Sequence, residues 1–115
     1  MVERIKKGKT LHGIVVHGGV AYTAGIGADD IGQDMEGQTR QICAKIDALL
    51  ASAGSDKSKL LRAEIFITDM ARKPDMDRAW LAWLDESDLP ARATIGVADL
   101  GDPQRLIEVI VTAAC

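Results

Sequence analysis

The sequence predicts an α+β fold, in which a single mixed sheet of up to six strands carries two helices on one face. Short runs rich in β-branched residues recur between turn residues, which is typical of strands. Two longer segments instead gather their apolar residues on one helical face. The chain has 115 residues, 47% of them hydrophobic and 27% charged, so we expect one domain over residues 1–115.

Three strands are expected in the first part of the chain, over residues 2–5, 13–17 and 20–26. Gly18 and Gly19 separate the last two of them. A pair of glycines suits a two-residue hairpin turn, because both turn positions need a positive φ. The first part of the chain is therefore expected to supply a hairpin to the sheet, followed by a loop over residues 27–33 that contains Gly and Asp.

A long helix is expected after Asp34, which is a favourable N-cap, and Gly54 is a natural stop for it. Its apolar positions recur with a period near 3.6 residues, at Ile42, Ile46, Leu49, Leu50 and Ala53. Cys43 lies beside this stripe and is interpreted as a small packed apolar residue. One face of the helix is therefore expected to cover the sheet.

A strand over residues 60–70 and a second helix follow. The strand alternates, and one of its faces is expected to hold Leu61, Ala63, Ile65 and Ile67. Pro74 suits the first turn of a helix. The stripe of this helix consists of Met76, Ala79, Trp80, Trp83 and Leu84. The two tryptophans are interpreted as core anchors.

The last two expected strands cover residues 90–98 and 106–111, and the Gly, Asp and Pro between them predict a hairpin. These strands are almost wholly apolar, yet one carries Arg92 and the other Glu108. Buried charges are rare unless they are paired or used. Either both side chains face water at a sheet edge, or both line a cleft, where Arg92 could hold a carboxylate through two parallel hydrogen bonds.

Both faces of the last strand are apolar, with Leu106 and Ile110 on one side and Ile107, Val109 and Val111 on the other. The two helices can cover only one face of the sheet, and an uncovered apolar face is an association surface. We therefore expect a homo-oligomer, with clefts between its subunits.

Composition excludes several classes of protein. A net charge of −3 disfavours a nucleic-acid binder. No apolar run approaches the roughly 20 residues of a membrane span, and the N-terminus lacks an apolar signal core. Cys43 and Cys115 match neither a disulfide nor a metal spacing, and His12 and His17 have no neighbouring ligands. We expect a cytoplasmic protein without a metal or a cofactor.

Several segments together resemble the RidA/YjgF family of reactive-intermediate (enamine/imine) deaminases, also labelled endoribonuclease L-PSP. The similarity covers nearly the whole chain from Gly13. The matching segments are GGVAYTAG at 18–25, QTRQ at 38–41, residues 49–54, IFITDM at 65–70, PAR at 90–92 and IEV at 107–109. The resemblance implies a chorismate-mutase-like fold and a homotrimer with three clefts between its subunits.

The resemblance also implies roles for single residues. Arg92 matches the arginine that clamps the substrate carboxylate, Glu108 the acidic residue that positions the attacking water, and Gly25 the cleft glycine. Other family positions differ. The N-terminal tyrosine is met by Leu11 and His12, the serine before the cleft glycine by Ala24, the cysteine after the arginine by Thr94, and a second acidic residue by Ile110.

The predicted function is hydrolysis of reactive 2-imino or enamine acids to 2-oxo acids and ammonia. Arg92 would anchor the carboxylate and Glu108 would orient water, while Gly25, Thr94, Ala24 and Leu11 would line the cleft. The alternative is a non-catalytic module that binds small carboxylate metabolites in the same inter-subunit cleft. A nuclease, the family's older label, is disfavoured by the net charge and by the lack of a His–His or carboxylate cluster.

Overall fold

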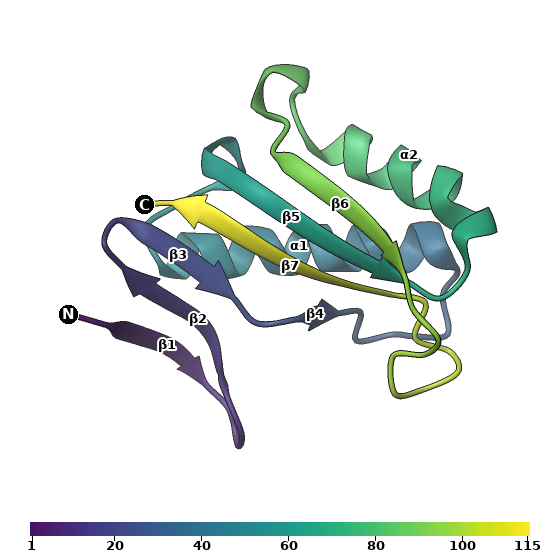
Figure 1. The fold of residues 1–115 in the computed structure, drawn as a ribbon, viewed down its shortest axis with the longest axis horizontal. Coiled ribbons are helices and arrows are strands. Elements are labelled where there is room, and N and C mark those ends of the chain that lie inside the picture. The colour runs from purple at the N-terminus through teal and green to yellow at the C-terminus, as the bar shows by residue number, and fades with distance from the viewer.

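The computed structural model describes residues 1–115 and contains one seven-stranded mixed sheet (Figure 1). Its strands lie in the order β1-β2-β3-β7-β5-β6, and the short β4 pairs with β7. Their bounds are β1 Glu3–Lys7, β2 His12–His17, β3 Val20–Thr23, β4 Ile26–Gly27, β5 Leu60–Ile67, β6 Ala91–Gly96 and β7 Ile107–Ala114. The hairpin predicted at the two glycines joins β2 to β3. Gly18 and Gly19 have φ of 59° and 77°, as a primed two-residue turn requires.

Both long helices pack on one face of this sheet. Helix α1 covers Met35–Ser52 and α2 covers Lys73–Trp83, and in Figure 1 α1 runs behind the strands. Asp34 caps α1 as predicted, because its side chain accepts a hydrogen bond from the Gly37 amide. Three short 3-10 helices fill connections: η1 at Lys57–Lys59, η2 at Met70–Arg72 and η3 at Glu86–Asp88. No helix combines the length and the apolar composition that a membrane crossing requires.

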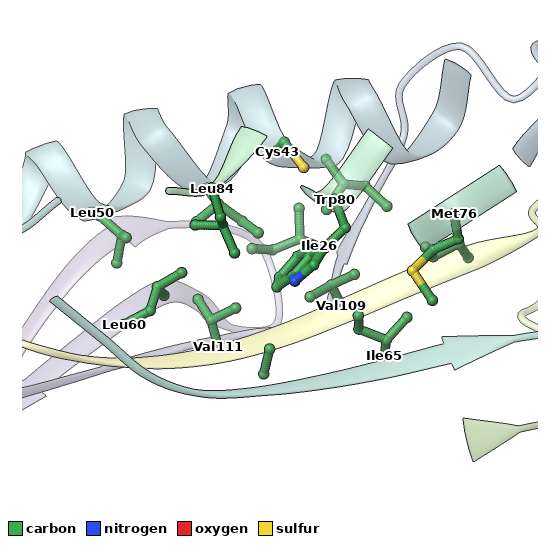
Figure 2. Packing of buried hydrophobic residues seen from close by; sticks show 14 of the residues in the cluster. Ile26, Cys43, Leu50, Leu60, Ile65, Met76, Trp80, Leu84, Val109 and Val111 are labelled. Atoms are coloured by element: carbon green, nitrogen blue, oxygen red, sulfur yellow. The ribbon is translucent and has the colours of Figure 1, made fainter. Parts of the chain in front are cut away.

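The core lies between the helices and the sheet, as Figure 2 shows. Each helix buries its predicted stripe: Ile42, Ile46 and Leu50 are fully buried in α1, and Met76, Ala79, Trp80 and Leu84 are buried at α2, while Leu49, Ala53 and Trp83 are half-buried. Cys43 packs in this cluster, and burial, which disfavours the thiolate, raises its pKa to about 12. The side chain therefore acts as a small apolar core residue.

The predicted hairpin between the last two strands is wrong. β5 lies between β6 and β7, pairing parallel with β6 and antiparallel with β7. The reason is α2, which connects β5 to β6. Parallel neighbours need such a crossover, and a helix that packs back onto the sheet provides it. The Gly- and Asp-containing segment before β7 therefore passes the end of β5 and is not a tight turn.

Two strand boundaries also differ from the prediction. The strand expected over residues 20–26 is broken at Ala24 and Gly25 into β3 and β4, which raises the strand count to seven. The strand expected over residues 60–70 ends at Ile67, and Asp69 then caps η2. A register shift between Leu60 and Arg62 turns Leu61 outward, so Leu61 is 49% exposed while Leu60 is buried.

The sheet face opposite the helices carries no layer of its own. Strand pairing places Phe66 beside Glu108 and Ile95, and Glu64 beside Ile110. The neighbouring inward residues Ile107, Val109 and Val111 are fully or almost fully buried, whereas these outward ones are half-buried or exposed. We call this surface the open face, defined by Tyr22, Phe66, Ile95, Glu108 and Ile110. It matches the expectation that one apolar face would be left uncovered within a single chain.

Candidate functional site

Arg92 lies on the edge strand β6, and its side chain points toward α2. The parallel register pairs Arg92 with Ala63, which is fully buried beneath the helices, so both side chains share the helix-covered face. The Nη2 atom of Arg92 lies 2.8 Å from Oδ1 of Asp77 on α2. About a quarter of each side chain is exposed, 24% for Arg92 and 25% for Asp77. The main chain of Arg92 remains open because β6 has no neighbour on its outer side.

The contact between Arg92 and Asp77 is an oblique ion pair. Although Nη2 and Oδ1 are close, Oδ1 is buried and accepts no well-aligned hydrogen bond. A guanidinium carries five N–H donors in a planar fork. Only Nη2 contacts Asp77, and the other N–H groups meet no partner within the chain, so most of the fork is left to bind an anion.

Asp77 also receives a second cation. Lys73, one helical turn earlier on α2, places Nζ 2.8 Å from Oδ2 of Asp77. Partial burial alone would raise the pKa of Asp77, but the hydrogen bond from Lys73 and the charge of Arg92 outweigh it and lower that pKa below its usual value. Asp77 therefore stays ionised at neutral pH. The local group of Lys73, Asp77 and Arg92 carries one surplus positive charge, which suits a single carboxylate.

A cavity of about 260 Å³ opens beside this ion pair. It is lined by Asp77, Trp80, Leu81, Leu89, Pro90 and Arg92, so one polar end faces a mainly apolar wall. Trp80 is almost fully buried, while Leu81 and Leu89 remain 55% and 47% exposed at the surface. This arrangement, a guanidinium at the end of an apolar hollow, is chemically suited to an organic acid.

Glu108 and Gly25 lie together on the open face. β4 pairs with β7 through Gly27 and Glu108, and the Glu108 side chain extends over the neighbouring Gly25. A Cβ atom at Gly25 would lie only 2.5 Å from Oε1 of Glu108, so a larger residue there would require the flexible end of the Glu108 side chain to move. None of the ion pairs in the chain involves Glu108. Its carboxylate is thus free to accept a proton or a hydrogen bond.

A single chain does not bring Arg92 and Glu108 together. Arg92 lies on the helix-covered face of β6 and Glu108 on the open face of β7, with β5 between the two strands. A cleft shared by these two residues therefore needs a second copy of the chain. The shared cleft stays a prediction.

The remaining expected lining residues are spread over the sheet. Thr94 shares the face of Arg92, and its buried hydroxyl has no hydrogen-bond partner. Ala24 is half-buried beside Gly25, and its amide donates to the carbonyl of Gly13. Leu11 is 56% exposed next to β2, near the sheet edge opposite β6. One chain therefore groups Thr94 with Arg92 and Ala24 with Glu108, and leaves Leu11 apart from both.

Sequence reasoning missed Asp77 and the positioning role of Gln38. The Gln38 side chain is fully buried, and its amide nitrogen lies 2.8 Å from the carbonyl oxygen of Gln104 while its amide oxygen accepts from the Leu106 amide. Gln38 thereby fixes the start of β7, two residues before Glu108. The spacing of Lys73 and Asp77 was a signal for an ion pair, but their contact with Arg92 depends on the packing of α2 against β6.

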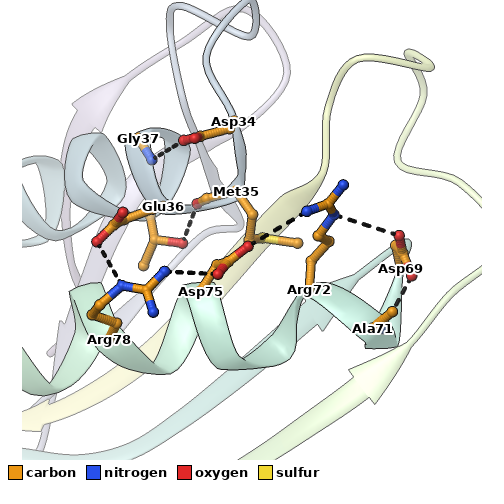
Figure 3. Close-up of polar contacts among 10 residues, drawn as sticks. Asp34, Met35, Glu36, Gly37, Asp69, Ala71, Arg72, Asp75 and Arg78 are labelled. Carbon is orange, nitrogen blue, oxygen red and sulfur yellow. Dashed lines mark hydrogen bonds and ion pairs between the residues drawn. The ribbon is translucent and has the colours of Figure 1, made fainter.

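One exposed ion pair joins α2 to the start of α1 (Figure 3). Arg78 bridges Glu36 of α1 and Asp75 of its own helix, with nitrogen–oxygen distances of 3.1 and 2.7 Å. Hydrogen bonds to Asp75 and Glu36 raise the pKa of Arg78. Exposed pairs contribute little stability each. The chain has no group of three His, Cys, Asp or Glu side chains placed to hold a metal ion.

The fold and site together define a class: small α+β proteins with an open sheet face and an arginine beside a cavity suited to a carboxylate. Comparison with known proteins narrows this class. A family model described as Endoribonuclease L-PSP matches residues 4–115. A RutC family protein of Haemophilus influenzae is 36% identical over 115 residues, which cover 99% of this chain and 98% of the relative.

Solved structures agree with the sequence relatives. An uncharacterized protein from Pseudomonas aeruginosa superimposes with a TM-score of 0.94 at 35% identity, covering 99% of this chain and 98% of that one. A member of the YjgF protein family from Neisseria meningitidis gives a TM-score of 0.95 at 29% identity, covering 99% and 94%. The chain belongs to the Endoribonuclease L-PSP family, which includes the RutC, YjgF and Rid proteins.

Proposed function

We propose that the protein hydrolyses reactive 2-imino or enamine acids to 2-oxo acids and ammonia. One observation carries the proposal: the Arg92 guanidinium lies at a cavity of about 260 Å³, and within the chain only its Nη2 atom contacts a carboxylate, that of Asp77. A planar fork of this kind binds a carboxylate through two parallel hydrogen bonds. Membership of a family that includes Rid proteins supports the same assignment.

The proposed site lies between copies of the chain in a homotrimer. Arg92 of one subunit and Glu108 of the partner subunit would face each other, because one chain places these residues on opposite faces of the sheet. The open face supports this arrangement, since it is apolar, has no covering layer and carries Glu108. Light scattering is expected to give about three times the chain mass of 12.3 kDa.

The proposed chemistry needs positioning and one proton carrier. Arg92 would hold the carboxylate and so fix the adjacent imine carbon beside a water molecule. Glu108 would accept a proton as that water adds to the carbon of the protonated imine, giving a neutral carbinolamine. The same proton would then pass to the amino nitrogen. As the carbon–nitrogen bond breaks, Glu108 would take the proton of the carbinolamine hydroxyl, so that the 2-oxo acid and ammonia leave and this last proton passes to the ammonia. No covalent enzyme intermediate is required, which fits a chain whose buried cysteine has a pKa raised to about 12.

The test combines binding and turnover. A 2-imino acid generated in situ by an amino-acid oxidase is supplied to the native protein, and its loss is compared with the spontaneous rate. Arg92→Ala is expected to abolish both the acceleration and the binding of 2-oxo acids. Glu108→Gln is expected to keep binding but slow hydrolysis, since only the proton acceptor is lost. Arg40→Ala, which removes an exposed arginine of α1, is the matched control. Binding of 2-oxo acids by Arg92→Ala as tight as by the native protein would refute the anchor.

A non-catalytic carboxylate-binding module is the second candidate. It is favoured because few of the expected lining residues are polar: Ala24 and Leu11 have no side-chain hydrogen-bond donor, and the Thr94 hydroxyl is buried. In that case 2-oxo acids bind through Arg92, but no 2-imino acid is consumed faster than it decays alone.

We also propose a cytoplasmic location, since both cysteines are free and a reducing compartment keeps thiols in that form.

A further inference from the structure

Two adjoining hollows lead away from Arg92. The first, of about 260 Å³, holds Arg92 and Asp77 at one end, and the second, of about 400 Å³, is lined by Leu81, Leu84, Glu86 and Leu89. Leu81 and Leu89 line both of them, so the hollows are neighbouring parts of one depression. We call it the Leu81–Leu89 groove, defined by the lining residues of the two hollows. One end holds the ion pair of Arg92 and Asp77, and the carboxylate of Glu86 lies toward the other end.

The groove walls come from two elements that face each other. Leu81 follows Asp77 by four residues on α2, so one helix face presents a charged and an apolar side chain side by side. Leu89 and Pro90 lie between η3 and β6, directly before the strand that carries Arg92. Leu81 and Leu89 are among the most exposed large apolar side chains of the chain. Core packing therefore does not account for either leucine, whereas an apolar ligand group would.

We propose that this groove receives the side chain of the acid held by Arg92, and that it selects 2-imino acids whose side chain is large, apolar and uncharged. This inference rests on the proposed function, because it takes Arg92 as the carboxylate anchor. Leu81 and Leu89 are its specificity-determining residues. Glu86, which lines the second hollow, disfavours a second carboxylate on the ligand, since like charges repel in a partly desolvated site.

The size of the first hollow agrees with this class of ligand. An apolar cavity of roughly 150 Å³ already accepts benzene. The hollow beside Arg92 is larger, about 260 Å³, so a branched or aromatic side chain fits within it. Burial of each methylene group favours binding by about fourfold, which follows from the usual transfer free energy. A branched side chain of four carbons is therefore expected to bind at least about tenfold more tightly than a methyl group, even when part of it stays exposed.

Calorimetry with 2-oxo acids, which are stable analogues of the imines, tests the proposal on the native protein. Phenylpyruvate and 4-methyl-2-oxopentanoate are expected to bind at least about tenfold more tightly than pyruvate, and 2-oxoglutarate more weakly than either. Leu81→Gln and Leu89→Gln are each expected to reduce the ratio of phenylpyruvate affinity to pyruvate affinity several-fold. Val2→Gln, at an exposed apolar residue before β1, is the control and should change nothing.

The outcomes separate this inference from the proposed function. Equal affinities for pyruvate and phenylpyruvate, both lost in Arg92→Ala, would overturn the groove and leave the anchor intact. Binding of all 2-oxo acids that does not depend on Arg92 would refute the proposed function and the groove together. Light scattering on the two glutamine variants checks their assembly. A change in their molar mass would show that the leucines belong to an interface between copies, which also overturns the proposal.

Discussion

Replacing Asp77 by Asn should reveal how strongly the ion pair beside the cavity holds Arg92. Asn keeps the shape of the side chain but removes the charge that faces both Arg92 and Lys73, each 2.8 Å away. Removing one member of an exposed pair costs about 0.2–1 kcal/mol, and of a fully buried pair about 3–5 kcal/mol. Asp77 and Arg92 are only about one-quarter exposed, at 25% and 24%, but solvent still reaches both. We therefore expect a loss of about 1–2 kcal/mol in the free energy of unfolding at pH 7.

The pH dependence of this loss identifies its electrostatic origin. Because the pKa of Asp77 in the folded protein lies below its unfolded value of 3.8, folding favours the ionised carboxyl. Its contribution to stability is complete above the unfolded pKa and is lost as the pH falls through the folded one. The difference between the native protein and Asp77→Asn should therefore be constant from pH 7 to pH 5 and shrink below pH 4.

Urea denaturation followed by circular dichroism, at one fixed protein concentration, measures both effects. Asp29→Asn is the matched control, because Asp29 also pairs with a lysine but is 87% exposed, and its replacement should change stability much less. Equal stability of the native protein and Asp77→Asn at pH 7 would refute the reasoning. So would a difference that persists unchanged at pH 3, since it would then arise from packing and not from charge.

Two further predictions concern the packing of α1 and the surroundings of Glu108. Leu50→Ala, at a fully buried position, should lower the free energy of unfolding by about 2–5 kcal/mol. Leu49→Ala, at a half-buried position, should lower it clearly less. Equal decreases for the two variants in urea denaturation would show that the buried face of the helix is misassigned. Gly25→Ala should keep the fold, because the end of the Glu108 side chain can move, yet slow imine hydrolysis with little change in 2-oxo acid binding. Unchanged turnover of Gly25→Ala would contradict the proposed role of Glu108 in hydrolysis.

Features that depend on residues close together in the sequence were predictable from it. The Asp34 cap, the Gly18–Gly19 turn and the buried positions of both helices follow from local preferences and from the 3.6-residue period, and the structure confirms them. Strand pairing is different, because a strand's neighbours are set by contacts far apart in the chain. The segment before β7 has the composition of a hairpin turn, yet α2 places β5 between β6 and β7.

In the candidate site, too, some residues could be predicted from the sequence and others depend on contacts between segments far apart in the chain. Arg92 and Glu108 stand out in the sequence because each is a charge on an apolar strand, and Gly25 and its neighbours are found through the family resemblance. Asp77 could not be found in this way, since an acidic residue on an amphipathic helix is ordinary. Its importance comes from the parallel register of β5 and β6, which turns Arg92 toward α2. The exposure of Leu81 and Leu89 likewise becomes informative only once the cavity is located.

The position of Arg92 on an edge strand connects the site to assembly. An edge strand has unpaired main-chain groups, so it is a place where a second chain can approach. In the proposed trimer, the open face of another copy would bring its Glu108 toward this edge. Asp77 holds Arg92 within its own chain, and in the proposed trimer the proton acceptor would come from the partner subunit. In such an arrangement one subunit would supply most of the contacts that bind the ligand, whereas hydrolysis would need residues of two subunits. Variants that weaken assembly should therefore lose turnover at protein concentrations at which they still bind 2-oxo acids.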